Sequence, residues 1–166
     1  MENVTTVESP EDSPSGRTAC YACLLFRTLI GPEDKKPFHV TLINQIALPF
    51  VPTSEISLGL EVDSHFQNDE THIDKVMWHK ATNTFHVECE LSRGCGEEVA
   101  SYYLRDGWQL DLETAVRFKS AKDALSSAEE YKDETVIAFD GGWYTLTPSE
   151  LWCLVKDGRV FEIVKA

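Results

Sequence analysis

The chain has 166 residues, of which 42% are hydrophobic and 26% are charged, so it has enough apolar material for a globular core. Its 28 acidic residues outnumber 15 Lys and Arg residues and give a net charge of -13. Nucleic-acid backbones and anionic membrane surfaces bind through Lys and Arg, so this charge argues against both as partners. It is compatible with a basic protein partner, and equally with an acidic surface that only keeps the chain soluble.

The first ten residues, MENVTTVESP, contain no basic segment and no apolar run, and no stretch of the chain approaches the length of an apolar transmembrane helix. We therefore expect neither a signal peptide nor a membrane span. An odd number of cysteines, five, favours reduced thiols and a cytoplasmic location over a disulfide framework. Residues 1–16 are rich in Ser, Pro and acidic residues and predict a disordered acidic tail. Residues 17–166 then form a single domain, with a subdivision near 94–107 as the alternative.

Alternating apolar residues predict three strands in the first third of the chain. The apolar positions of the first strand are Ala22, Leu24, Phe26 and Ile30, and those of the second are Phe38, Val40, Leu42, Ile46, Leu48 and Phe50. The third strand alternates Ile56, Leu58, Leu60 and Val62 with polar residues and glycine. One buried face and one wet face is the pattern of an antiparallel sheet.

The segments IDKVMWHK and FHVECEL predict a hairpin around the turn ATNT. Closing the hairpin at that turn pairs His79 with His86 and Lys75 with Glu90. One face then carries Val76, Trp78, Phe85, Val87 and Cys89. The other face carries Lys75, His79, His86, Glu88 and Glu90, so charged and imidazole groups gather on one side.

The second half of the chain predicts three short helices, at 97–105, 121–131 and 148–156. Gly107 lies at the expected C-terminal cap of the first, Ser120 is a plausible N-cap of the second, and Thr147 with Glu150 forms a capping box for the third. A hairpin with a two-glycine turn, VIAFD-GG-WYTLT, precedes the third helix, and a strand at 160–165 follows it. A hairpin at Asp157-Gly158 is the alternative to the third helix. Strands come first and helices later, so the predicted class is α+β with a mainly antiparallel sheet.

Two sets of side chains are candidate metal ligands. His79 and His86, expected to face each other across the hairpin, can bring two imidazoles to one ion, with Glu88 as a third ligand. A divalent metal is therefore a candidate cofactor, although nothing in the sequence requires one, and an ordinary wet surface is the simpler interpretation. Cys20 and Cys23 have the spacing of half a zinc site, but in a strand they point to opposite faces, which favours buried thiols.

Other catalytic and binding motifs find no support. The acidic segment 63–74 lacks the glycine and the final glutamate of a calcium-binding loop, and the chain has neither a nucleophile elbow nor a phosphate-binding loop. Trp108, Trp143 and Tyr144 are candidates for partner binding, because exposed aromatic residues anchor protein interfaces.

The sequence as a whole favours a non-enzymatic protein-interaction domain, such as an acidic inhibitor or immunity-type protein that binds a basic protein partner. Two alternatives stay open. One is a metal-binding protein or metal-dependent enzyme that uses the histidine pair. The other is a small-molecule-binding domain.

Overall fold

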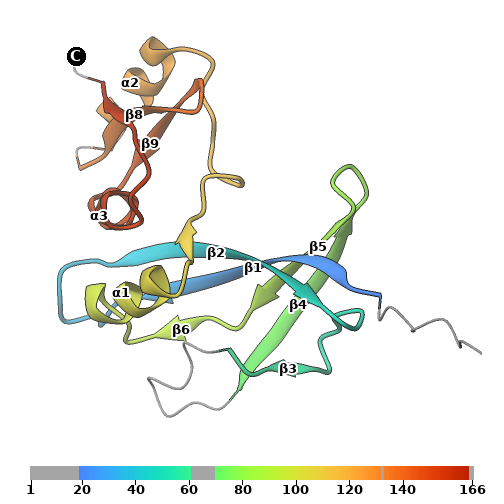
Figure 1. The fold of residues 1–166 in the computed structure, drawn as a ribbon. Helices are drawn as coiled ribbons and strands as arrows, with labels where there is room; N and C mark the ends of the chain where they lie inside the picture. The colour runs from blue at the N-terminus through green and yellow to red at the C-terminus, as the bar shows by residue number, and fades with distance from the viewer. Residues whose placement is uncertain (1–18, 61–69, 132, 165–166) are drawn as a thin grey trace, which may run out of the picture.

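The computed structural model describes residues 19–60, 70–131 and 133–164. These residues form an α+β fold with a large mixed sheet and a small antiparallel sheet (Figure 1). The elements in chain order are β1 (Tyr21–Ile30), β2 (His39–Leu48), β3 (Ser57–Leu58), β4 (Thr71–His79), β5 (Thr84–Cys89), β6 (Ser92–Arg93), α1 (Glu97–Arg105), β7 (Gln109–Leu110), α2 (Ala121–Glu130), β8 (Thr135–Phe139), β9 (Gly142–Leu146), α3 (Pro148–Lys156) and β10 (Glu162–Ile163). The predicted acidic tail at 1–16 and most of the acidic segment 63–74 lie outside the described residues.

The large sheet has the strand order β3-β4-β5-β1-β2-β7, and β6 pairs with the end of β1. Its ladders are antiparallel except where β1 runs parallel to β5 and β6. The small sheet has the order β10-β8-β9. The predicted class, α+β with a mainly antiparallel sheet and helices in the second half, is therefore confirmed.

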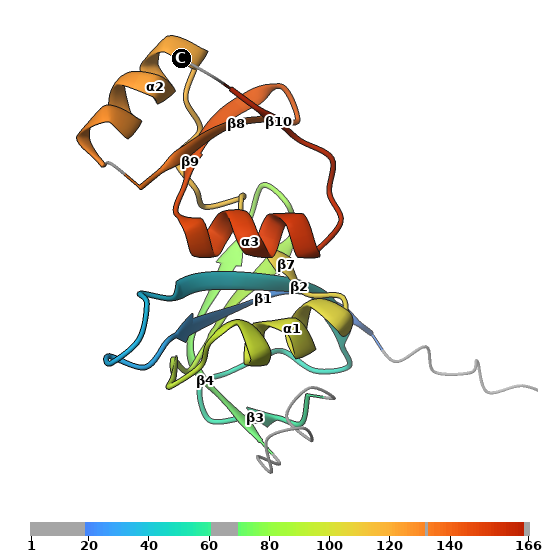
Figure 2. The same ribbon diagram turned by 90° about the vertical axis from the view of Figure 1, so that its left-hand side faces the viewer.

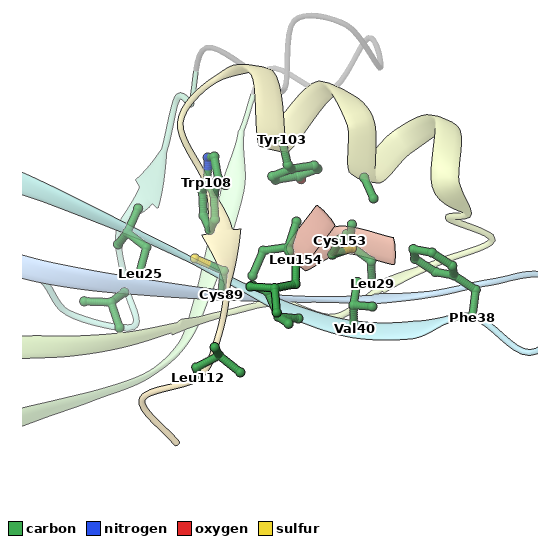
Figure 3. Close-up of a cluster of buried hydrophobic side chains, with 14 of the residues drawn as sticks. Leu25, Leu29, Phe38, Val40, Cys89, Tyr103, Trp108, Leu112, Cys153 and Leu154 are labelled. Carbon is green, nitrogen blue, oxygen red and sulfur yellow. The ribbon is translucent and has the colours of Figure 1, made fainter. Parts of the chain in front are cut away.

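The main core lies on one face of the large sheet, under α1 and α3. From β1 it takes Cys23, Leu25 and Leu29, and Figure 3 shows Tyr103 of α1 and Leu154 of α3 in the same buried cluster. Figure 2 shows α3 next to β2 and β7, the two strands of the large sheet that it contacts. The same core cluster includes side chains from both sheets, since Ile137 of β8 and Leu146 of β9 belong to it.

The first strand buries both of its faces, where the sequence pattern predicted one. Leu24 and Phe26 form a second, smaller buried cluster with Ile43 of β2, on the side away from the main core. The reason is the position of β1 between β2 and β5, because side chains of both neighbours, Ile43 of β2 and His86 of β5, lie against Phe26 on this face. We call the side of the sheet that carries this second cluster the open face.

The three helices occupy their predicted positions, and α2 ends one residue earlier than expected. Ser120 caps α2 by accepting a hydrogen bond from the Asp123 amide, at 3.1 Å. Thr147 and Glu150 form the predicted capping box of α3, which excludes the alternative hairpin there. The third and last strands are shorter than predicted, with two residues each in β3 and β10.

The hairpin between β8 and β9 turns one residue earlier than the glycine pair suggested. Asp140 and Gly141 both have positive φ angles, of 44° and 68°, and Gly142 already pairs with Phe139. A two-residue hairpin turn needs positive φ at both central positions, and Asp-Gly is a favoured pair for it.

The β4–β5 hairpin keeps its predicted faces, but the predicted pairing is wrong by two residues. His79 lies opposite Thr84, Met77 opposite His86, and Lys75 opposite Glu88. The cause is a turn made by residues 80–83, in which Asn83 has a φ of 51°; asparagine tolerates this left-handed conformation, so Thr84 joins the strand. A shift of two residues leaves every side chain on the same face.

The end of α3 is tied to the large sheet by a buried ion pair. Arg159 Nη2 lies 2.5 Å from Asp157 Oδ2 and donates to the Leu110 carbonyl at 2.7 Å, while the Leu110 amide donates to Asp157 Oδ2 at 3.1 Å. Asp157-Gly158, a hairpin signal in the sequence, thus ends a helix and fixes it to β7. The helices of the described ranges are too short or too polar to cross a membrane.

Candidate functional site

The candidate site is a cleft of about 440 Å³ on the open face of the large sheet. Its walls come from β1, β2, β4 and β5 and from the segments that follow β5 and β7; no helix contributes a lining residue. We call it the open-face cleft. Its volume lies within the usual range of pockets that hold small ligands or single side chains.

Three carboxylates line the open-face cleft: Asp74, Glu88 and Asp111. No Lys or Arg residue lies among its lining residues in the described part of the chain. The other polar lining groups are His86 and three threonines, and two of these, Thr28 and Thr41, place their hydroxyl oxygens 2.9 Å apart. An array of this composition attracts cations, because three carboxylates face one concave space.

A β-bulge brings Asp74 to the cleft. Ile73 lies opposite Cys89 and Lys75 lies opposite Glu88, so Asp74 is the extra residue of the bulge. Ile73 is buried in the main core, and regular alternation would put Lys75 on that core side as well. The bulge instead turns both Asp74 and Lys75 toward the open face, where Asp74 lines the cleft.

Asp111 is held in place by its own loop. Its amide donates to the Thr41 carbonyl at 2.9 Å, which continues the short pairing between β2 and β7. Its Oδ1 accepts from the amides of Glu113 and Thr114, at 2.9 and 3.1 Å, and its Oδ2 accepts from the Thr114 hydroxyl. The carboxylate is buried and fixed, so it contributes a preorganised negative charge to the cleft.

Glu88 already has a cation beside it. Lys75 Nζ lies 3.3 Å from Glu88 Oε1, and both side chains are about half exposed. Exposed ion pairs of this kind stabilise a protein by about 0–1 kcal/mol, so Lys75 is a weak and displaceable partner. Any cation that enters the cleft competes with the Lys75 ammonium for Glu88.

One wall of the cleft consists of aromatic rings and a methionine side chain: Phe26, His86 and Met77. The rings of Phe26 and His86 are tilted by 49° with their centroids 5.3 Å apart. Met77 lies opposite His86 in the ladder and lines the same cleft. Aromatic faces and carboxylates together suit a cation that is planar or that has apolar groups next to its charge. The guanidinium of arginine, at the end of its methylene chain, has both features.

The two predicted histidine ligands lie close together, but in a different arrangement from the predicted one. His79 and His86 are diagonal neighbours, stacked with ring centroids 4.8 Å apart and an interplanar angle of 8°. Lone pairs of imidazole lie in the ring plane, so two parallel stacked rings do not aim their nitrogens at one ion. Within the described ranges, no three His, Cys, Asp or Glu side chains are grouped as a metal-binding set. His86 and Glu88 line the open-face cleft, and His79 packs behind His86.

The predicted partner-binding aromatics lie mostly inside the fold. Trp108 is 2% exposed and packs edge-on against Tyr103, Tyr144 is also buried, and Trp143 is half-buried. The prominent exposed aromatics are instead Trp78, at 54%, and Tyr131, at 58%. The sequence pattern put Trp78 on the face of the hairpin that carries Val76, Phe85, Val87 and Cys89. The exposure of Trp78 could have been predicted from its place beside a hairpin turn, because the tip of a hairpin extends past the neighbouring elements that would cover its side chains.

Three of the cysteines have a raised thiol pKa. Burial raises the pKa of Cys23 and that of Cys153, the latter to about 12. Burial also raises the pKa of Cys95, an effect that the nearby Arg27 guanidinium partly offsets. The five cysteines, all in the described ranges, form no disulfide, and Cys20 is exposed while Cys23 is buried.

Comparison of the chain with models of protein families, with curated proteins and with solved structures finds no match.

Proposed function

We propose that this chain is a non-enzymatic binding protein of the acidic inhibitor or immunity type, whose open-face cleft receives a Lys or Arg side chain of a basic protein partner. The observation that carries the proposal is the lining of the cleft: three carboxylates, an aromatic and thioether wall, and no Lys or Arg among the lining residues of the described part. A guanidinium matches this lining best, because it pairs with carboxylates in a planar fork and stacks on aromatic rings.

The charge of the whole chain supports the same partner class. A net charge of -13 raises the rate at which a basic protein meets this surface and repels nucleic acid. Binding that depends on such steering weakens as salt concentration rises. We further propose a cytoplasmic location, supported by five cysteines that form no disulfide.

The test is calorimetric titration of the chain with a hexa-arginine peptide, at low and at physiological salt. The cleft variant Asp74→Asn/Glu88→Gln is compared with Glu129→Gln/Glu130→Gln, which removes two exposed carboxylates from α2 and leaves the cleft intact. We expect the cleft variant to lower the affinity by at least about fivefold and the α2 variant by less than about twofold. Equal losses in the two variants would mean that the peptide responds to overall charge and not to the cleft.

Replacement of Lys75 should have the opposite effect on the affinity for hexa-arginine. Lys75→Met removes the ammonium that lies against Glu88 and leaves the cleft-lining residues unchanged. The proposal predicts tighter binding of hexa-arginine by this variant than by the wild type. Weaker or unchanged binding would show that Glu88 does not take part.

A small organic cation could bind the same carboxylates as a cationic side chain of a protein, and the cleft volume is large enough for one. Titration with N-acetyl-arginine amide separates the two sources. A micromolar affinity for this single residue would favour a small-molecule ligand, whereas tight binding of the hexapeptide alone favours a protein.

A divalent metal held by His79, His86 and Glu88 is a second candidate function. The close approach of the two imidazoles favours it, but one ring must rotate out of the stack before both nitrogens can reach one ion. Calorimetric titration with Zn²⁺, using protein without a histidine tag, tests it. Binding that His79→Ala abolishes would support the metal site, and absent or unchanged binding would rule it out.

A further inference from the structure

A second cleft, of about 430 Å³, lies where the two sheets meet and shares no lining residue with the open-face cleft. Ile43 and Gln109 line it from the large sheet, and Phe139 and Tyr144 line it from the small sheet. The segment after β7, the turn between β8 and β9, and Arg159 complete the lining. We call it the junction cleft. Small ligands often bind where two structural units meet, in clefts of this size.

Two arginines line the junction cleft, and each is held in place by its own contacts. Arg159 is paired with Asp157, and its Cζ atom lies 5.4 Å from the centre of the Phe139 ring. Arg117 donates through Nη2 to the Asp140 carbonyl, at 3.0 Å. Among the residues that the structure describes, the Nη1 atom of neither arginine makes a hydrogen bond. Both guanidinium groups therefore keep donors for a ligand.

Gly142 provides the space in which the Arg117 side chain lies. A Cβ atom at this position would be 2.8 Å from Cγ and 2.9 Å from Cδ of Arg117, closer than side chains can pack. The φ angle of Gly142 is not positive, so the backbone conformation does not require glycine here. The glycine instead allows Arg117 to cross the backbone of β9, and any larger residue would displace the guanidinium.

Two carboxylates, Glu113 and Asp140, line the same cleft. Within the described ranges, neither carboxylate takes part in a hydrogen bond or an ion pair. The charge of Arg159 is already balanced by Asp157, so the charges left for a ligand are the Arg117 guanidinium and these two carboxylates. A lining that offers both signs of charge is complementary to a ligand that carries both signs.

Tyr144 adds a buried hydroxyl group without a partner. The residue is 6% exposed and lines the junction cleft, and its hydroxyl makes no hydrogen bond in the part of the chain that the structure describes. Buried tyrosine hydroxyls usually have a hydrogen-bond partner, so this one is available to a polar atom of a ligand. Phe139, Leu112 and Ile43 supply apolar surface beside it.

We propose that the junction cleft binds a free α-amino acid with an apolar side chain. The carboxylate of the amino acid pairs with the Arg117 guanidinium, and its ammonium group donates to Glu113 and Asp140. Its side chain packs against the apolar surface that includes Phe139. This binding does not depend on the ligand of the open-face cleft, because the two clefts have no lining residue in common.

The test is calorimetric titration of the full chain with L-leucine, with L-phenylalanine and with two analogues of leucine. The analogue 4-methylpentanoate lacks the ammonium group, and 3-methylbutylamine lacks the carboxylate. We expect a dissociation constant below about 1 mM for at least one of the two amino acids. Each analogue should bind at least about tenfold more weakly than leucine, because it leaves charged groups of the cleft without a partner. No binding of either amino acid, or equal binding of leucine and 4-methylpentanoate, would overturn the proposal.

Three variants test the assigned residues with the amino acid that binds more tightly. Arg117→Gln should raise its dissociation constant by at least about tenfold. Lys119→Gln is the matched control, because it removes an exposed positive charge two residues away that does not line the cleft, and it should change the constant by less than about twofold. Gly142→Ala keeps every charge but displaces Arg117, so it should also weaken binding, with circular dichroism as the check that it folds. Equal dissociation constants for Arg117→Gln and Lys119→Gln would overturn the site.

Discussion

Arg27 lies in the main core without a hydrogen-bond partner for two of its nitrogens. It is 3% exposed and shares the face of β1 that carries Leu25 and Leu29. Its Nε and Nη1 atoms are buried and make no hydrogen bond. Each unsatisfied buried polar group costs about 1–3 kcal/mol, so the two nitrogens together cost about 2–6 kcal/mol.

Replacement of Arg27 by Met should therefore stabilise the protein. Methionine keeps the flexible apolar stem and removes the buried charge and both unsatisfied nitrogens. Taking the lower end of this range, we expect the free energy of unfolding to rise by about 2 kcal/mol. For a chain of this length that corresponds to an increase in Tm of about 4–8 °C.

Urea unfolding followed by circular dichroism measures the change. Leu29→Ala, two residues along the same buried face, is the control and should lower the free energy of unfolding by about 2–5 kcal/mol. A second readout is Cys95: burial raises the pKa of its thiol and the Arg27 guanidinium partly offsets that rise, so without Arg27 its alkylation by iodoacetamide should slow. A loss of more than about 1 kcal/mol in Arg27→Met would refute the reasoning, because it would mean that the guanidinium has a favourable partner in solution.

Two further predictions concern α3 and its end. Burial raises the pKa of Cys153 from its ordinary 9.0 to about 12, so its thiol stays protonated in the fold while it ionises in the unfolded chain. Its contribution to stability is complete below pH 9 and is lost between pH 9 and 12, so Cys153→Ala should show a shallower fall in Tm over that range than the wild type. Asp157→Asn should lower the free energy of unfolding by about 2–4 kcal/mol, because it leaves the half-buried Arg159 without its charged partner. Lys75→Met, which breaks an exposed pair, should change it by less than about 1 kcal/mol in the same urea titration.

The helices were predictable from the sequence because their signals are local. Ser120 and the Thr147–Glu150 box mark helix starts within four residues, and the structure uses both. The short β3 was harder to predict, since its length depends on how much of β4 it meets.

The cleft was predictable in its residue types but not in its geometry. Two of its residues, His86 and Glu88, were already assigned to one wet face of the hairpin, and that face is correct. The position of the turn depends on the left-handed Asn83, and the place of Asp74 depends on a bulge; neither has a periodic signature in the sequence. Asp111 is more than 20 residues away along the chain and reaches the cleft only because β7 pairs with β2.

The most direct measurement of the central claim is a map of where a single cation binds. The ¹⁵N-labelled chain is titrated with N-acetyl-arginine amide, and with the citrulline analogue as an uncharged control of the same shape. Our account predicts that arginine shifts the amide resonances of cleft residues such as Phe26, Asp74, His86 and Thr114, and that citrulline does not. Shifts spread over the acidic residues of α2, or equal shifts with citrulline, would contradict it.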